Sequence, residues 1–105
     1  MTDRQWLDVC AETDFLETDR REWTGPDGEE VIVIRKDRQY FALSNQCTHA
    51  QALMIGATID GYEIECPLHG ARFDIRSGRV TAPPATTSLK CYPVRVADGR
   101  VWIRI

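Results

Sequence analysis

Two short pairs of metal-binding side chains in the middle of the chain restrict its fold more than any other feature. The first pair lies in Cys47-Thr48-His49 and the second in Cys66-Pro67-Leu68-His69, with sixteen residues between them. They contain both histidines of the protein and two of its four cysteines. Thiolates and imidazoles bind transition metals, and four such ligands can close one site. We therefore expect the fold to bring these two segments together around a metal.

The order of the ligands separates two kinds of metal site. A structural zinc site with two cysteines and two histidines usually has both cysteines on one arm and both histidines on the other. Here each arm carries one sulfur and one nitrogen. That order suits a two-iron centre in which the cysteines hold one iron and the histidines hold the other. A structural zinc module that mediates protein interaction stays open as an alternative.

The residues around the two pairs carry a family resemblance. Cys47–His49 together with Cys66–Asp74 resembles the signature of Rieske-type ferredoxins, the electron carriers of bacterial multicomponent ring-hydroxylating oxygenases. Downstream, Asp74–Val80 and Ala82–Ala85 are similar to the segment that covers the cluster from a third side in this family. The resemblance extends over about residues 31–105. It implies an all-β fold, in which an antiparallel β-sandwich or barrel base carries a small cluster-binding subdomain.

The same resemblance implies a cofactor, a function and partners. The cofactor is one Rieske-type 2Fe-2S cluster, with Cys47 and Cys66 on the inner iron and His49 and His69 as the exposed ligands. The function is to carry single electrons from a flavin-containing NAD(P)H-dependent reductase to a terminal aromatic-ring-hydroxylating dioxygenase, in the catabolism of aromatic hydrocarbons. The small Rieske-like subunit of an assimilatory nitrite reductase is a further alternative.

Four positions near the ligands bear on the redox potential. High-potential Rieske proteins have an extra cysteine in each loop, and serine and tyrosine hydroxyls that donate to the cluster sulfurs. Ala52 and Leu68 stand where those cysteines would be, and Ala71 and Phe73 replace the hydroxyl residues. Each missing hydrogen bond leaves the reduced, negative cluster less stabilised. We expect a potential at the low end of the Rieske range, which is roughly −150 to +300 mV.

The size of the chain and its two histidines bear on whether we expect the protein to activate oxygen itself. Its 105 residues predict a single domain over residues 1–105, with the cluster-binding subdomain at about residues 44–86. A mononuclear iron oxygenase needs a further site of two histidines and a carboxylate. Both histidines are already assigned to the cluster. We expect an electron-transfer protein and not an enzyme.

Charge and hydropathy bear on the compartment of the protein and on whether it binds nucleic acid or a membrane. The first thirty residues hold ten acidic and three basic side chains, and no basic tract indicates nucleic-acid binding. The N-terminus lacks the apolar core of a signal peptide, and no apolar run reaches the roughly 20 residues of a membrane span. We therefore expect a soluble cytoplasmic monomer without a membrane anchor. In that reducing compartment Cys10 and Cys91 should be buried free thiols.

The strand pattern comes from β-branched runs and turn residues. Strands are expected at Gln5–Cys10, Val31–Ile34 and Gln39–Leu43, the second covered on both faces, with one helical turn at Asp14–Glu17 and a polar segment at Asp19–Glu30. Turns at Asp60-Gly61 and Asp98-Gly99 predict two further hairpins, the first between Ala57–Ile59 and Tyr62–Ile64 and the second between Cys91–Val96 and Arg100–Ile105.

The ligand arms should lie on loops at the tip of a small sheet, where partners dock. Pro67 ends the strand that leads to Cys66, and Gly70 either lets backbone approach the cluster or only makes a turn. Arg72, Arg76 and Arg79 outnumber Asp74 beside these arms. We expect this basic flank to attract an acidic partner surface.

Overall fold

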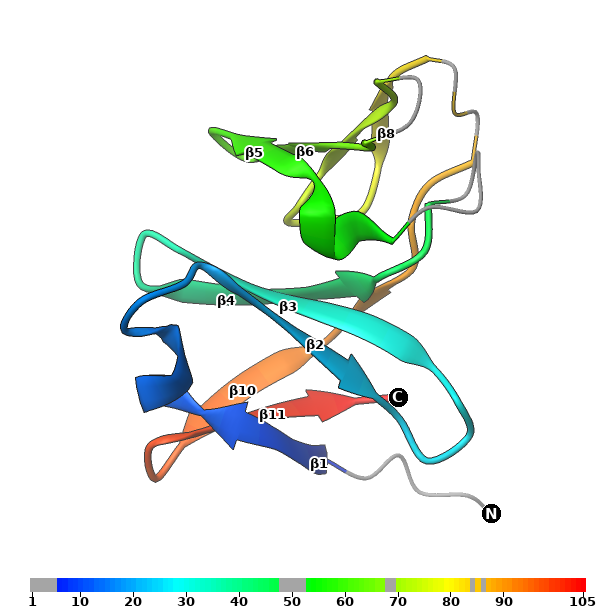
Figure 1. Cartoon of the computed structure of the whole chain (residues 1–105). Helices are drawn as coiled ribbons and strands as arrows, with labels where there is room; N and C mark the ends of the chain where they lie inside the picture. Colours follow the sequence, from blue (N-terminus) through cyan, green and yellow to red (C-terminus); the bar gives the residue numbers. More distant parts are fainter. Residues whose placement is uncertain (1–5, 48–52, 68–69, 84, 86) are drawn as a thin grey trace.

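The chain folds almost entirely into antiparallel β-strands. The computed structural model describes residues 6–47, 53–67, 70–83, 85 and 87–105, and these residues form eleven strands and two 3-10 turns without an α-helix. The strands make three sheets that lie one above another in Figure 1. The expected all-β class is confirmed. No helix in this part of the chain is long and apolar enough to cross a membrane.

Two of the sheets form the base of the molecule. The lower sheet in Figure 1 has the order β1-β11-β10, from β1 (Trp6–Ala11), β11 (Arg100–Arg104) and β10 (Val94–Ala97). The middle sheet has the order β2-β3-β4-β9, from β2 (Arg20–Thr24), β3 (Glu30–Lys36), β4 (Gln39–Ser44) and β9 (Cys91–Tyr92). The turn η1 (Glu12–Phe15) links β1 to β2, and its Phe15 ring packs edge-on against Tyr40.

The third sheet is a four-stranded meander inserted between β4 and β9. After the turn η2 (Met54–Gly56), its strands run in sequence order: β5 (Thr58–Asp60), β6 (Glu63–Glu65), β7 (Arg72–Asp74) and β8 (Val80–Ala82). It lies above β3 and β4 in Figure 1. Tyr62, in the β5–β6 turn, donates its hydroxyl hydrogen to Asp37 of the β3–β4 turn over 2.5 Å, and so joins this sheet to the base.

Strand β3 lies between two hydrophobic cores. All four residues from Val31 to Ile34 have 0% of their surface exposed. Val31 and Val33 pack with the lower sheet, against residues such as Val101 and Ile103. Ile32 and Ile34 pack with the third sheet, against residues such as Ile64 and Phe73. The prediction of a strand covered on both faces is confirmed.

The hairpins form at the expected places, with small shifts in register. In the β5–β6 hairpin, Asp60 pairs with Glu63, so the two turn residues are Gly61 and Tyr62 and the expected pairing was wrong by one residue. The observed register places Ile59 opposite Ile64, which is fully buried. Packing of these isoleucines therefore outweighs the local preference for an Asp-Gly turn.

The predicted strand Cys91–Val96 is in fact two strands in two sheets. Cys91 and Tyr92 pair with β4, whereas Val94–Ala97 pairs with β11 across the expected Asp98-Gly99 turn. Pro93 stands between them and cannot donate a backbone hydrogen bond to continue either ladder. The chain therefore crosses from the middle sheet to the lower sheet at this residue.

Three strands were not expected from the sequence: the short strands β7 and β8 of the third sheet, and β2 of the base. The sequence predicts a polar segment at Asp19–Glu30, but Arg20–Thr24 forms β2 and pairs with β3 along its whole length. β2 is an edge strand and has no fully buried side chain, so its sequence lacks the apolar alternation of a half-buried strand.

The two remaining cysteines differ in exposure. Cys10 is 3% exposed and packs in the lower core, as expected for a buried thiol. Cys91 is a free thiol as well, but it is exposed, so the prediction of burial was wrong for this residue. In β9 the adjacent Tyr92 takes the inward position, and alternation turns Cys91 outward.

Burial of Cys10 predicts a loss of stability in alkali. Desolvation raises the pKa of its thiol from 9.0 to about 11, with a further contribution from the charge of Asp14. The unfolded chain therefore loses this proton first as the pH rises. The neutral thiol stabilises the fold fully below about pH 9, and this contribution, about 3 kcal/mol, disappears as the pH rises through about 11.

The measurement compares the drop in unfolding temperature between pH 8 and pH 10.5 for the wild type and for Cys10→Ala. We expect a smaller drop in the variant, whatever its stability at pH 8. Equal drops would show that Cys10 ionises as it does in the unfolded chain.

Candidate metal centre

Cys47 and Cys66 are both buried in the core between the base and the third sheet. They are 4% and 1% exposed and belong to the same buried cluster, which also contains Met54, Ile64 and Phe73. Two buried thiols in the same apolar core are suitable soft donors for an iron-sulfur or zinc centre. The other two predicted ligands, His49 and His69, lie outside the described residues, as do Ala52, Leu68 and Pro84.

The arm that contains Cys66 is the loop between β6 and β7. Glu65 pairs with Arg72 at the ends of the two strands, and the backbone N–H of Cys66 donates to the carbonyl of Ala71 over 2.7 Å. Gly70 has a φ of +73°, which side chains rarely allow. A Cβ there would meet only Glu65 Oε2, at an ordinary 3.7 Å. Among the described protein atoms, the positive φ of the turn is therefore the feature that calls for a glycine, and an approach of its backbone to the cluster stays a prediction.

The arm that contains Cys47 is closed in the same way. Gln46 and Leu53 form an isolated antiparallel bridge, and the N–H of Met54 donates to the carbonyl of Asn45 over 2.5 Å. Each cysteine is thus the first residue inside a loop whose base is pinned by antiparallel pairing. The cysteines are buried at the bases of their loops, and each predicted histidine follows two or three positions further along.

Asn45 anchors the base of the first arm. Its side chain has no exposed surface, accepts a hydrogen bond from the Ile55 N–H over 2.9 Å and donates one to Glu22 over 2.8 Å. Its backbone N–H donates to the carbonyl of Glu30. A buried amide without partners would cost about 1–3 kcal/mol, so these bonds hold η2 and the end of β4 together.

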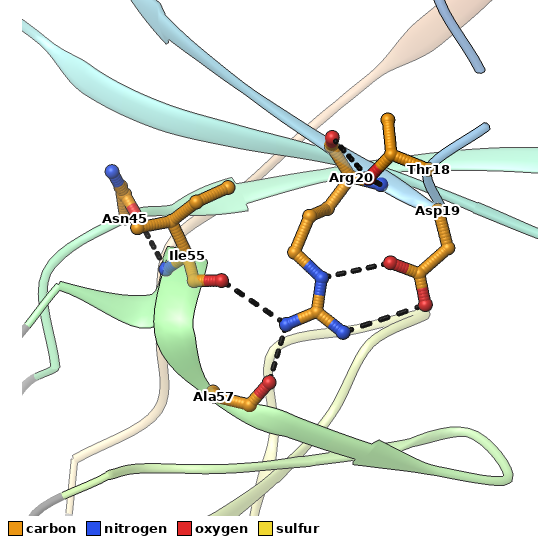
Figure 2. Close-up of polar contacts among 6 residues, drawn as sticks. All are labelled: Thr18, Asp19, Arg20, Asn45, Ile55 and Ala57. Carbon is orange, nitrogen blue, oxygen red and sulfur yellow. Dashed lines mark hydrogen bonds and ion pairs between the residues drawn. The ribbon is translucent and has the colours of Figure 1, made fainter.

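Arg20 reaches from β2 to the middle of the same turn and to Ala57, the residue that follows it. Its Nη1 donates to the carbonyl oxygens of Ile55 and Ala57, and its Nε donates to Asp19 over 2.8 Å (Figure 2). The hydrogen bond from Arg20 lowers the pKa of the Asp19 carboxyl, so the pair stays charged at neutral pH. Neither Arg20 nor Asn45 was identified from the sequence. Asn45 is two residues before Cys47, which was a usable signal, whereas Arg20 had none.

The expected basic flank beside the arms was wrong. Arg72 forms ion pairs with Glu63 at 2.8 Å and Glu65 at 3.1 Å, and Arg76 pairs with Asp74 at 2.9 Å. The hydrogen bond from Arg76 lowers the pKa of Asp74. Residues 53–83 contain four carboxylates against three arginines, so this sheet has no excess of positive charge. Counting the arginines against Asp74 alone missed the carboxylates of β5 and β6.

Ala71 and Phe73 are both fully buried in the cluster that contains the two cysteines. Neither side chain has a hydroxyl. The two positions that were expected to lack a hydrogen-bond donor therefore lie in the same core as Cys47 and Cys66. Among the described residues, no group of three or more His, Cys, Asp or Glu side chains could hold a metal ion. A centre on Cys47 and Cys66 therefore needs donors from elsewhere in the chain.

Known proteins match this chain over nearly its whole length. The family model of the Rieske [2Fe-2S] domain matches residues 5–93. The ferredoxin component of a naphthalene 1,2-dioxygenase system from Pseudomonas putida is 37% identical over 94% of each chain. A chain in the complex of reduced oxygenase and oxidized ferredoxin of carbazole 1,9a-dioxygenase superposes with a TM-score of 0.88, at 32% identity over 97% of this chain and 94% of that one.

A second solved structure shares the fold alone. It is described as a putative NADH-dependent nitrite reductase small subunit from Mycobacterium tuberculosis, and it superposes with a TM-score of 0.86. It is only 21% identical, over 99% of this chain and 97% of that one.

Proposed function

The chain belongs to the Rieske [2Fe-2S] domain family, and from this premise we propose that it carries single electrons to a terminal aromatic-ring-hydroxylating dioxygenase. The observation that carries the proposal is the pair of buried cysteines, each at the base of a loop that antiparallel pairing closes. The chain is also similar over 94% of its length to a dioxygenase ferredoxin component. The donor is a flavin-containing NAD(P)H-dependent reductase. The protein is a cytoplasmic monomer and not a catalyst in its own right.

Four residues hold the Rieske 2Fe-2S cluster in this proposal. Cys47 and Cys66 take the inner iron, and His49 and His69 take the outer one. When bound, such a cluster supplies a one-electron couple that histidine ligation raises above the potential of all-cysteine clusters. Burial of both cysteines excludes water from the sulfur side. Residues 44–86 act as the cluster-binding subdomain on the two base sheets.

The two other functions have less support. The nitrite reductase similarity is one of fold, at an identity too low to carry a function. A structural zinc module would need the same cysteines but no labile sulfide, and the mixed ligand order is unusual for it. Metal analysis and co-purification separate all three: a sirohaem protein as partner would favour the nitrite reductase subunit.

The first prediction concerns the cofactor. The pure protein should be reddish-brown and contain about two irons and two labile sulfides per chain, because both thiolates and both imidazoles are needed for one cluster. The reduced protein should give an electron paramagnetic resonance (EPR) spectrum with a lower mean g value than all-cysteine clusters. A colourless protein with one zinc would contradict the assignment.

The second prediction concerns the potential. Because Ala71 and Phe73 provide no hydroxyl, the midpoint should lie in the lower half of roughly −150 to +300 mV. The double variant Ala71→Ser, Phe73→Tyr should raise it, since new donors to the cluster stabilise the reduced form. Ala42→Ser, in the lower core, adds a buried hydroxyl elsewhere and should leave the voltammogram unchanged. A double variant with an unchanged midpoint would show that neither position reaches the cluster.

The third prediction concerns docking. Reductase and oxygenase use the loop end of the third sheet in turn, around His49, His69 and Pro83-Pro84. Leu53 directly follows the first loop and is 49% exposed, which suits an apolar contact. Leu53→Ser should slow reduction of the oxygenase roughly fivefold, the equivalent of about 1 kcal/mol of lost apolar burial. Stopped-flow mixing of the reduced protein with the oxygenase measures the rate.

Val96→Ser is the matched control, because Val96 is 41% exposed on β10 in the lower sheet. It should react at the wild-type rate. Salt should have little effect, since charges on the third sheet are nearly balanced. Equal slowing by both variants, or a steep salt dependence, would contradict docking at this end.

A further inference from the structure

We propose that Arg20 and Asn45 are positioning residues for the first ligand loop, and that they set the geometry of the cluster from outside it. This inference rests on the proposed function only in assuming a bound 2Fe-2S cluster. Neither residue is a ligand. Arg20 belongs to the base, Asn45 directly follows β4, and both hold η2, the turn that follows the loop of Cys47.

The first step is the place of η2 in the chain. The backbone leaves Cys47, passes through the loop and η2, and then enters the β5–β6 hairpin that leads to Cys66. A displacement of η2 therefore moves the end of the first arm relative to the second. Met54, inside η2, is fully buried in the hydrophobic core that also contains Cys47 and Cys66. A displacement of η2 therefore also disturbs the packing around the two sulfurs.

The second step is the set of hydrogen bonds by which Arg20 of the base holds η2. Arg20 lies thirty-five residues before Ile55 and bonds the carbonyls of Ile55 and Ala57 with one nitrogen (Figure 2). Its side chain is 18% exposed, and Asp19 binds the rest of the fork. A guanidinium has five donors in a rigid plane, which a lysine ammonium cannot reproduce. By binding two carbonyl groups at once, Arg20 fixes both the position and the orientation of η2 relative to the base.

The third step is the role of Asn45 on the other side of η2. Its side chain and its carbonyl bind consecutive N–H groups of η2, at Ile55 and Met54, while Glu22 holds its amide nitrogen. Glu22 and Arg20 both come from β2. The edge strand that the sequence did not reveal therefore supplies two of the groups that position the metal arm.

The experiment uses the purified holoprotein and three variants. Arg20→Met removes the donors but keeps an apolar stem, and Arg20→Lys keeps the charge without the fork. The matched control is Tyr62→Phe, which removes the hydrogen bond from the third sheet to Asp37 of the base without touching η2. Each is assayed for iron and labile sulfide, EPR line shape, midpoint potential and the rate of cluster loss to a chelator.

Arg20→Met should broaden the EPR lines, shift the midpoint and lose its cluster about tenfold faster, the factor expected for one charge-assisted hydrogen bond. Arg20→Lys should recover only part of each change. Tyr62→Phe should match the wild type in line shape and midpoint. The proposal is overturned if Arg20→Met retains the wild-type line shape and midpoint, or if Tyr62→Phe changes them equally.

A milder variant covers the case in which Arg20→Met does not fold. Asp19→Asn removes the charged partner of Arg20 at a half-exposed position and should shift the same signals in the same direction by less. Wild-type signals in Asp19→Asn, with Arg20→Met unfolded, would count against positioning. The proposed function fails separately: a wild type without labile sulfide overturns the cluster, and one that does not reduce a dioxygenase overturns only the partner.

Discussion

Burial of β3 on both faces is the constraint on which the rest of the structure depends. Val31 to Ile34 present two side chains to each of two cores, and all four are fully buried. At about 1.5–3 kcal/mol for each fully buried aliphatic side chain, this run is among the strongest local contributions to the fold. Because one strand serves both cores, the lower sheet and the third sheet are held at fixed positions relative to each other.

The polar contacts around η2 add orientation to the spacing that β3 sets between the base and the third sheet. Ile32 and Ile34 fix the distance between the base and the third sheet, but hydrophobic packing is non-directional. Direction comes from Asn45 and Arg20, which bind particular backbone atoms of the turn. A metal centre needs its ligands held within a narrow range of geometry, and such bonds provide it.

The ligand motif and the hairpins could be read from the sequence because their signals are local. The two Cys/His pairs, the β-branched run of β3 and the Asp98-Gly99 turn each lie within a few neighbouring residues. The misses came from interactions between distant segments. β2 becomes a strand only by pairing with β3, Cys91 turns outward because Tyr92 faces the core, and Arg72 is neutralised by Glu63 and Glu65 on the adjacent strand.

The insertion of the third sheet has a consequence for how such proteins diversify. The chain leaves the base after Ser44 and returns at Lys90, and these two residues are joined by a hydrogen bond of 2.8 Å from the Ser44 N–H to the Lys90 carbonyl. Residues 45–89 therefore form an excursion whose two ends meet, and a segment of this kind can be exchanged without rethreading the base. A transplanted segment must match its host at few places, chiefly the face of β3 that carries Ile32 and Ile34 and the position of the Arg20 side chain. The inserted segment, residues 45–89, and the base can thus vary almost independently. Because Arg20 and Glu22 of β2 bind this segment, β2 is a part of the base that a new segment has to fit.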